Sequence, residues 1–405
     1  MRKIARGLLL GFVFAIPWEY SLDLGPPWGN VARFAGLLLL LATIPTVLLA
    51  GRVRKPAALQ WLTLALYLWF SCTCFWTIEP YLTLEKMRGY FQEMMIVWLI
   101  WEFSETAEDL LAILRVWLAG SGALAVLTIA DFVLTDTRTS DQFRFVAVGQ
   151  DPNDVARFLV FGFPIAALLF EGKGNRLGRA LALSYLPLGL AGVLLTASRS
   201  GFVGAAVALA GCGLLLLQNH ARGVLAGVIA LPVLGIAFWF VVPHETTLRF
   251  GTIAEQLQNG DLNERLNIWA AGWKAFVQAP ILGHGAGAFV SAAGLAPIDT
   301  AHNTALSILV EGGLCAFLVA SAIVVVSARS ILKTGGPLRV ALTTLLATWC
   351  LLSLVGTVGE NRTTWLLLAV IAVASRLSAE ESEIVASESC ALGGPVEAFP
   401  IGSGE

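Results

Sequence analysis

Charged side chains are scarce in this sequence. Asp, Glu, Lys and Arg make up only 13% of its 405 residues, whereas 57% of the residues are hydrophobic. A soluble domain carries roughly 25% charged residues, so this composition excludes water as the main solvent of the chain. The formal net charge is −2, and no basic face is concentrated along the sequence. A nucleic-acid partner is therefore excluded as well.

Histidine and cysteine are also rare, and the motifs of several soluble enzyme classes are missing. The chain has four histidines and six cysteines, and they do not stand at the spacing of metal ligands. It has no Gly-x-Ser-x-Gly elbow and no His-Glu-x-x-His, and Gly172-Lys-Gly174 lacks the spacing of a phosphate-binding loop. We therefore expect no metal, no cofactor and no nucleotide hydrolysis.

The sequence contains many long apolar segments. Their lengths are near the ~20 residues that cross a hydrocarbon core, and short polar breaks separate them. The basic start and the run after it resemble a signal peptide without a cleavage site, so we interpret that run as the first span. We predict an all-α polytopic membrane protein with about twelve transmembrane helices, at 7–17, 34–50, 58–77, 89–101, 110–134, 153–170, 181–197, 200–217, 223–242, 304–327, 338–357 and 364–377.

Lys and Arg in the short loops predict the orientation in the membrane. With twelve spans, the basic clusters all fall on one side, which we assign to the cytoplasm together with both termini. The external side then receives the polar segments 136–151, 196–201, 243–300 and 360–362. The basic residues that set this orientation are Arg2, Lys3, Arg6, Arg52, Arg54, Lys55, Lys173, Arg176, Arg179, Arg222, Arg329, Lys333 and Arg339.

We predict one transmembrane domain, residues 1–377, and a disordered acidic cytoplasmic tail, residues 378–405. The domain includes a long external loop, residues 243–303, in which Asp261-Leu-Asn-Glu264 has the form of a helix-starting capping box. An amphipathic helix is expected to follow and to end near Pro280. Its apolar face, predicted to lie on the membrane surface or on the bundle, consists of Leu262, Leu266, Trp269, Trp273 and Phe276.

Two arginines on the external side are candidates for binding phosphate. Arg199 stands in Ala-Ser-Arg-Ser-Gly where two spans meet, and its planar guanidinium matches the oxygens of a phosphate or pyrophosphate. An arginine that reaches towards lipid headgroups is an equal alternative. Arg265 lies at the start of the amphipathic helix, where an ordinary surface arginine is the simpler interpretation.

The third candidate is His302, in Ala301-His-Asn303 at the end of the long loop. A histidine that titrates near neutrality can accept a proton from an attacking hydroxyl. The alternative is an interfacial histidine bonded to a carbonyl. Glu311 lies deeper in the next span, where an ionisable side chain usually has a partner or a role, and bracing of the bundle is the favoured role.

The string from Glu264 to Gly313 resembles the characteristic region of the O-antigen ligase and O-antigen polymerase superfamily. The similar segments are Glu-Arg-Leu-Asn-Ile-Trp, Ala-Pro-Ile-Leu-Gly-His-Gly-Ala-Gly-Ala-Phe, Ala-His-Asn-Thr-Ala-Leu and Val-Glu-Gly-Gly. Two further segments agree, Gln150-Asp-Pro-Asn-Asp154 and Thr196-Ala-Ser-Arg-Ser-Gly201. Together these segments cover under half of the chain, and the expected layout of spans and loop fits the same superfamily.

The resemblance implies a membrane glycosyltransferase of the GT-C type in the bacterial plasma (inner) membrane. Its donor would be a glycan linked to undecaprenyl pyrophosphate, and its acceptor a glycan or the lipid A core, with no metal and with inversion at the anomeric carbon. By motif position, His302 matches the base, and Arg199 and Arg265 match arginines that engage the donor pyrophosphate. Asn303, Glu311 and Trp269 are possible supporting residues, with Trp269 stacking on a sugar ring.

Several alternatives stay open on the sequence. Within the superfamily, the chain can be a ligase, a polymerase or a protein O-glycosyltransferase. Outside it, a bicarbonate-type solute transporter and a noncatalytic flippase or other polysaccharide-export component remain. A transporter more often has repeated halves, and we find no internal repeat. A noncatalytic protein should tolerate His302→Ala better than an enzyme that needs a base.

Overall fold

The computed structural model describes residues 1–26, 28–134, 144–172, 176–217, 265–297 and 299–391. Within these ranges the regular structure is helical, apart from a single bridge between Asp23 and Asn30. The elements are α1 (Arg2–Ala15), η1 (Ile16–Ser21), α2 (Val31–Ala50), α3 (Ala58–Cys72), η2 (Thr73–Phe75), α4 (Pro80–Phe103), α5 (Ala107–Leu134), α6 (Pro152–Glu171), α7 (Arg176–Leu195), the helix Arg199–Leu217, α11 (Arg265–Gln278), α12 (Phe289–Ala293), α13 (Thr304–Leu332), α14 (Gly336–Ser353) and α15 (Arg362–Ala391).

Nine helices in the described part of the chain are long and apolar enough to cross a membrane. They confirm a polytopic membrane protein. Of the twelve predicted spans, the one at 223–242 lies outside the described residues. The spans at 7–17 and 89–101 fall on α1, which has only 14 residues, and on α4, which carries charged residues such as Lys86 and Glu93. The count of twelve therefore stays a prediction.

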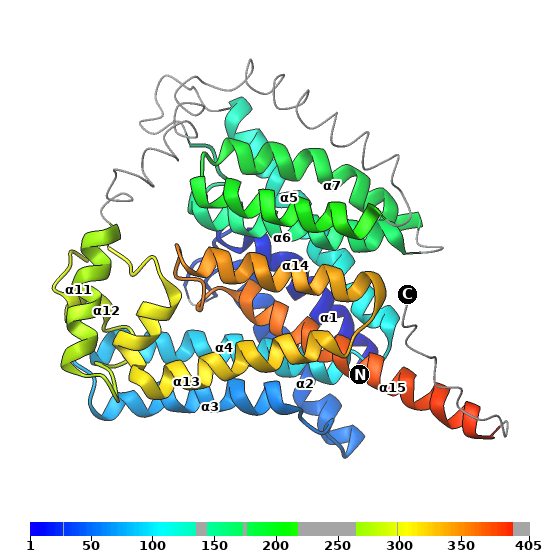
Figure 1. Ribbon diagram of the computed structural model, residues 1–405, viewed down its shortest axis with the longest axis horizontal. Coiled ribbons are helices and arrows are strands. Elements are labelled where there is room, and N and C mark those ends of the chain that lie inside the picture. Colours follow the sequence, from blue (N-terminus) through cyan, green and yellow to red (C-terminus); the bar gives the residue numbers. More distant parts are fainter. Residues whose placement is uncertain (27, 135–143, 173–175, 218–264, 298, 392–405) are drawn as a thin grey trace, which may run out of the picture.

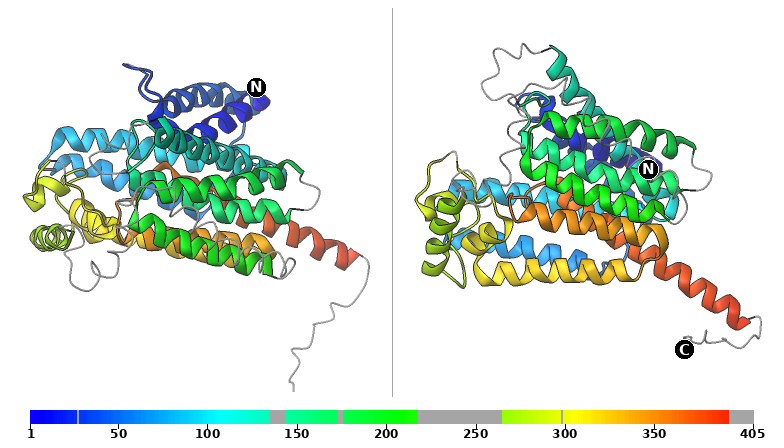
Figure 2. Two further views of the ribbon diagram at one scale, coloured as in Figure 1. Left: turned by 90° about the horizontal axis from the view of Figure 1, so that it is seen from above. Right: turned by 45° about the horizontal axis from the view of Figure 1, so that its top comes forward.

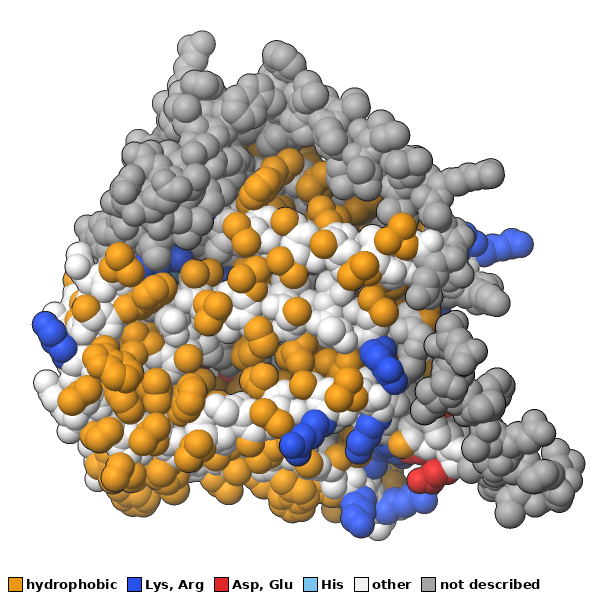
Figure 3. Space-filling view, in the orientation of Figure 1, with side chains coloured by type: hydrophobic (Ala, Val, Ile, Leu, Met, Phe, Trp, Pro, Cys, Tyr) orange, Lys and Arg blue, Asp and Glu red, His pale blue; other side chains and the backbone are white. Residues whose placement is uncertain are grey.

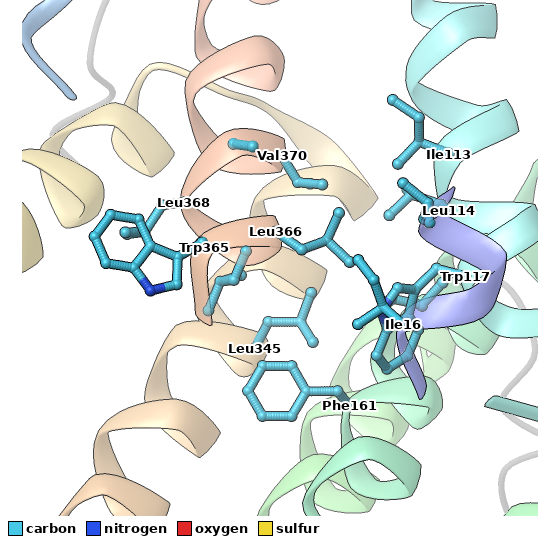
Figure 4. Close-up of a cluster of buried hydrophobic side chains, with 14 of the residues drawn as sticks. Ile16, Ile113, Leu114, Trp117, Phe161, Leu345, Trp365, Leu366, Leu368 and Val370 are labelled. Carbon is cyan, nitrogen blue, oxygen red and sulfur yellow. The ribbon is translucent and has the colours of Figure 1, made fainter. Parts of the chain in front are cut away.

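Two helices, α6 and α15, form the centre of the bundle. Their most apolar stretches are each 72% buried, more than in any other candidate span. In α15 every residue from Trp365 to Ala374 is buried, as expected for a helix that is apolar on all sides. Figure 4 shows Trp365 and Leu366 of α15 among side chains from other helices, including Phe161 of α6. The outer helices leave an apolar surface, which covers much of the face in Figure 3.

The loops gather at two opposite ends of the bundle. At one end Arg2 pairs with Glu105 at 2.6 Å, Arg6 pairs with Asp109, and the Arg54 N–H donates to Glu102 at 2.8 Å. The acidic residues around the turn between α4 and α5 are thus partnered by arginines of the predicted cytoplasmic clusters. The N-terminus lies towards this end, and α11 and α12 lie at the other (Figures 1 and 2).

One sequence prediction differs from the structure. The tail was expected to be disordered from residue 378, but α15 continues to Ala391, because Ala- and Glu-rich sequence favours a helix and Arg376 pairs with Glu380 one turn on. Residues 392–405 lie outside the described part.

The apolar face predicted for α11 is split in the structure. Phe276 packs inward, whereas Leu266 and Trp273 are 47% and 55% exposed, and Leu262 lies outside the described residues, as does the capping box. The inward face runs along Ile268, Gly272, Ala275 and Phe276, because the hydrophobic surface formed by α12 and the start of α13 meets the helix there.

Candidate functional site

Two of the similar segments, distant in sequence, are joined through Asn153. Its side-chain oxygen accepts hydrogen bonds from the Ser198 hydroxyl at 2.9 Å and from Arg144 Nη2 at 3.1 Å. Arg144 Nε in turn donates to the carbonyl of Thr196 at 3.1 Å. The start of α6 and the turn at 196–201 are therefore held together at one end of the bundle.

The start of α6 follows from its sequence. Asp151 is the N-cap, and its carboxylate accepts the backbone N–H groups of Asn153 at 2.8 Å and Asp154 at 3.2 Å. Pro152 occupies the first helical position, where its missing N–H costs no hydrogen bond. Arg157 follows within two turns and lies at the same end of the bundle.

The turn at 196–201 places Arg199 at the start of the next helix. Ala197 is fully buried and has a φ of 50°, in the left-handed region that residues other than glycine rarely adopt. The Ser198 hydroxyl accepts the N–H of Gly201 at 3.2 Å and so begins the new helix. This tight reversal brings the half-buried Arg199 to the end of the bundle that Arg157 occupies.

Helix α11 carries Arg265 and fixes the segment before His302. The indole Nε1–H of Trp269 donates to the carbonyl of Ala301 at 3.0 Å. This bond joins α11 directly to the residue next to the histidine. The proposed stacking of Trp269 on a sugar ring stays a prediction, but its Nε1–H is already engaged in positioning.

His302 has an unusual backbone conformation. Its φ is 45°, and the following residue, Asn303, caps α13 by accepting the N–H of Leu306 at 2.9 Å. The Asn303 amide also donates to the carbonyl of Leu354 at 3.2 Å. Conformations of this kind cost roughly 1–3 kcal/mol and cluster at active sites. Trp269 on one side and Asn303 on the other hold the strained residue in place.

Three guanidinium groups come together near this histidine. Burial lowers the pKa of Arg265, and the positive charges of Arg157 and then Arg199 lower it further. The arginine stays charged, because a guanidinium is not deprotonated in proteins. Arg199 and Arg265 are therefore close enough for the charge of one to act on the other.

Arg157 is the member of this cluster that the sequence analysis missed. Its Nη2 pairs with Asp154 at 2.6 Å and its Nε donates to the carbonyl of Asn153 at 3.0 Å. Its Nη1 is buried and has no hydrogen-bond partner among the described residues. A buried donor without a partner is costly, which makes Arg157 a candidate for binding an anion. The signal that could have found it is an arginine within two turns of an external helix cap.

The same cluster acts on His302. Burial lowers the pKa of the imidazole below its usual 6.5, and the charges of Arg265 and Arg157 lower it further. The carboxylates of Asp151 and Asp299 oppose this effect. His302 is consequently neutral at pH 7, which is the form that can accept a proton.

Glu311 lies apart from the arginine cluster. Both of its carboxylate oxygens accept from the Lys86 ammonium, at 2.7 and 2.6 Å, and Lys86 also pairs with Glu360 at 2.6 Å. The Glu311 and Lys86 side chains are 3% and 10% exposed. This triad joins α13, α4 and the loop before α15, in agreement with the bracing role favoured from the sequence.

The Gly-His-Gly segment lies against a break in α13. At Gly313 the φ is 65°, and the segment after α11 fills the break with backbone hydrogen bonds. The N–H groups of His284 and Gly285 donate to the carbonyls of Val310 and Glu311, both at 2.9 Å. A Cβ added at Gly283 would overlap the Glu311 carbonyl, so glycine is required there. The ring of His284 bonds the carbonyl of Ala275 at 2.8 Å and is structural.

A cavity of about 570 Å³ adjoins the cluster. It is lined by α4, by the chain between α12 and α13, by the first turns of α13 and by the segment that enters α15. Ala301 lines it, and His302 is the next residue. Among the described residues, no three His, Cys, Asp or Glu side chains form a group that could hold a metal ion.

Residues 185–321 match the family model described as O-antigen ligase. The match confirms the resemblance stated from the sequence, and it includes Arg199, Arg265, His302 and Glu311. Arg157 and Asn153 lie before the matched range, and the contacts described above connect them to it. No curated protein matches the chain.

Proposed function

We propose that the chain is a glycosyltransferase. The premise is that residues 185–321 form an O-antigen ligase domain in a multi-pass bacterial inner-membrane protein. The chain transfers a glycan from a polyprenyl pyrophosphate to an acceptor hydroxyl. The observation that carries the proposal is that His302, held in a left-handed backbone conformation before α13, lies near the guanidinium groups of Arg265 and Arg157, and that Arg199 lies near Arg265.

The arginines would bind the donor pyrophosphate. A guanidinium presents paired N–H donors that match phosphate oxygens, and it keeps its charge in a partly buried site. Of the three arginines, Arg157 is paired with Asp154, and the positive charges of Arg157 and Arg199 both act on Arg265. An undecaprenyl pyrophosphate donor fits, since its lipid can remain in the membrane while its anion meets the cluster.

Transfer proceeds by direct displacement. The neutral imidazole of His302 takes the proton from the acceptor hydroxyl as that oxygen attacks the anomeric carbon. The bond from this carbon to the pyrophosphate oxygen breaks, and the electron pair leaves with the pyrophosphate, whose growing charge the guanidiniums stabilise. One displacement inverts the anomeric configuration. The guanidiniums take the part that a divalent cation plays elsewhere, so the transfer is metal-independent.

The site would face the outside of the membrane. The opposite end of the bundle carries Arg2, Arg6 and Arg54, and basic residues favour the cytoplasm. Both termini would then be cytoplasmic, and the long loop external, in an architecture of the GT-C type. Ligase, polymerase and protein O-glycosyltransferase activities use the same chemistry and differ in the acceptor.

The test is transfer by the purified chain in liposomes that contain EDTA. The donor is a polyprenyl pyrophosphate oligosaccharide, and the acceptors are an oligosaccharide panel, lipid A core and a serine peptide. We expect a product of inverted anomeric configuration, and the acceptor that yields it distinguishes the three activities. A Mg²⁺ requirement, or retained configuration, would contradict the mechanism. Failure of the intact chain to transfer to any acceptor or to release the pyrophosphate would favour the transporter or scaffold alternatives.

A further inference from the structure

The cavity of about 570 Å³ beside the cluster has a lining of unusual charge. We propose that it is the acceptor subsite and that it receives the terminal sugars of an uncharged or amine-bearing glycan, not a phosphorylated one. This inference rests on the proposed transferase function and names the substrate class of its second site. The volume lies within the roughly 300–1,000 Å³ of small-molecule sites.

Its position suits an acceptor that attacks opposite the leaving group. Two backbone segments lie between the cavity and the arginine cluster. In the first, Ala301 lines the cavity and His302 follows. In the second, Thr357 lines the cavity, while a Cβ added at its neighbour Gly356 would meet the guanidinium of Arg157. A hydroxyl that enters from the cavity and a pyrophosphate held by the arginines would therefore meet the anomeric carbon from different sides.

Two buried side-chain oxygen atoms in the lining have no hydrogen-bond partner among the described residues. Glu93 is only 5% exposed, and its Oε2 has no hydrogen-bond partner among the described residues. The hydroxyl oxygen of Thr357 is also buried without a hydrogen-bond partner among the described residues. Both residues line the cavity, and buried polar groups are rarely left unpaired in folded proteins. A carboxyl oxygen and a hydroxyl in these positions can bind the O–H or N–H groups of a sugar.

The remaining lining selects against phosphate. Lys86 is already occupied by Glu311 and Glu360, and Arg362 is paired with Glu19. The carboxyl groups of the lining, which outnumber these two cations, belong to Glu85, Glu93, Asp299, Glu311 and Glu360.

The charge balance separates the two substrates. A phosphate group in the cavity would face like charge, whereas hydroxyls and ammonium groups find acceptors. Tyr20, which is 55% exposed, also lines the cavity and offers an aromatic face to a sugar ring. The arginine cluster thus attracts the anionic donor head, and the acidic cavity excludes it.

The experiment compares matched acceptors on the intact protein. Disaccharides of hexose, N-acetylhexosamine and free hexosamine are each supplied with and without a phosphate monoester on the terminal sugar, together with a polyprenyl pyrophosphate donor. We expect the wild type to prefer the unphosphorylated member of each pair it uses by at least about tenfold in kcat/KM, which corresponds to one lost polar contact. Equal use, or preference for the phosphorylated member, would overturn the inference.

Variants locate the effect in the cavity. Glu93→Gln should raise the KM for the acceptor about tenfold and the KM for the donor much less. Glu360→Lys should shift the preference towards the phosphorylated acceptor. Glu108→Gln, at the opposite end of the bundle, is the matched control and should change neither. The wild-type preference decides the outcome if a cavity variant does not fold.

Different results would contradict the proposed transferase function and the proposed acceptor subsite. If transfer requires His302 but its rate is unchanged by acceptor phosphate and by Glu93→Gln, the proposed function is supported and the proposed acceptor subsite is contradicted. A wild type that neither transfers to any acceptor nor releases pyrophosphate from the donor would remove both.

Discussion

At the scale of single residues, the site depends on one histidine whose protonation is set by its neighbours. His302 is partly buried beside Arg265 and Arg157, and all of these influences lower its pKa. The sequence identified His302, Arg199 and Arg265 because they stand in recognisable segments. It did not identify Arg157, since an arginine three residues after Asp154 looks like an ordinary helical ion pair until the fold brings it beside the histidine.

This arrangement predicts the pH dependence of transfer. The proposed mechanism needs the neutral imidazole, so activity should be lost only as the pH falls through a pKa below 6.5 in the free enzyme. Arg157→Gln removes a positive charge, so the pKa of His302 rises and the acidic limb of kcat/KM for the donor moves to higher pH. Arg115→Gln, at the opposite end of the bundle, should leave the limb in place. A wild-type limb above 6.5, or no movement in Arg157→Gln, would contradict the electrostatic account.

The donor should itself shift this titration. Bound pyrophosphate neutralises the arginines, so the pKa of His302 in the donor complex is higher than in the free enzyme. The acidic limb of kcat, which reports on the complex, should therefore lie at higher pH than the limb of kcat/KM. Coincident limbs would mean that the donor anion does not bind near His302.

At the scale of elements, positioning depends on contacts that local sequence patterns do not encode. The amphipathic pattern predicted α11 and its end, but the face that packs is set by α12 and the start of α13. The break in α13 at Gly313 could not be predicted from the local sequence either, because the backbone groups that fill it come from the segment after α11. Such long-range pairing is a property of the fold.

Trp269 is expected to act as a positioning residue. Trp269→Phe keeps an aromatic ring on α11 but removes the N–H that holds the Ala301 carbonyl. We expect kcat to fall by about tenfold, because His302 is less well aligned, while the KM for the donor changes little. Trp273→Phe, at an exposed position on the same helix, is the matched control. Equal kcat values for the two variants would show that the Ala301 contact has no role in alignment.

The break in α13 predicts a contrast between two glycines. Gly313→Ala places a Cβ against the backbone carbonyl of Ile281 at a positive φ, so we expect a loss of at least about 2 kcal/mol in stability. Gly213→Ala, at a helical position with open space around it, should be neutral or stabilising by about 0.5–1 kcal/mol. Thermal unfolding in detergent measures both. Similar melting temperatures for the two variants would argue against the break.

At the scale of the whole molecule, an apolar belt lies between an end that carries basic residues and an end that carries the candidate site. Hydrophobic runs predicted most of the spans because length and composition are local properties. The joining of residues 150–154 to 196–201 could not be predicted, since it depends on α6 and the helix Arg199–Leu217 beginning at the same end of the bundle. At the opposite end, the ion pairs of the acidic loop with Arg2 and Arg6 could not be predicted either, because the partners are far apart in the sequence.

A buried ion pair joins α15 to η1. Arg362, at the start of α15, pairs with Glu19 of η1, and the two side chains are 12% and 4% exposed. Glu19→Gln leaves the arginine buried with no counter-charge, so we expect a loss of about 3–5 kcal/mol in stability. Glu380→Gln breaks the exposed pair with Arg376 and should cost less than about 1 kcal/mol. The order of melting temperatures in detergent checks this, and the reverse order would show that the buried pair does not hold η1 to α15.

The measurement that tests the central claim most directly compares wild type with His302→Gln in a single sample series. Donor binding and single-turnover transfer are recorded on the same liposomes, with EDTA present and folding checked by thermal unfolding. The account predicts that His302→Gln binds the polyprenyl pyrophosphate donor as the wild type does, because the arginines are intact, but transfers its glycan at least about 100-fold more slowly. Transfer at the wild-type rate by folded His302→Gln would contradict the assignment of His302 as the base.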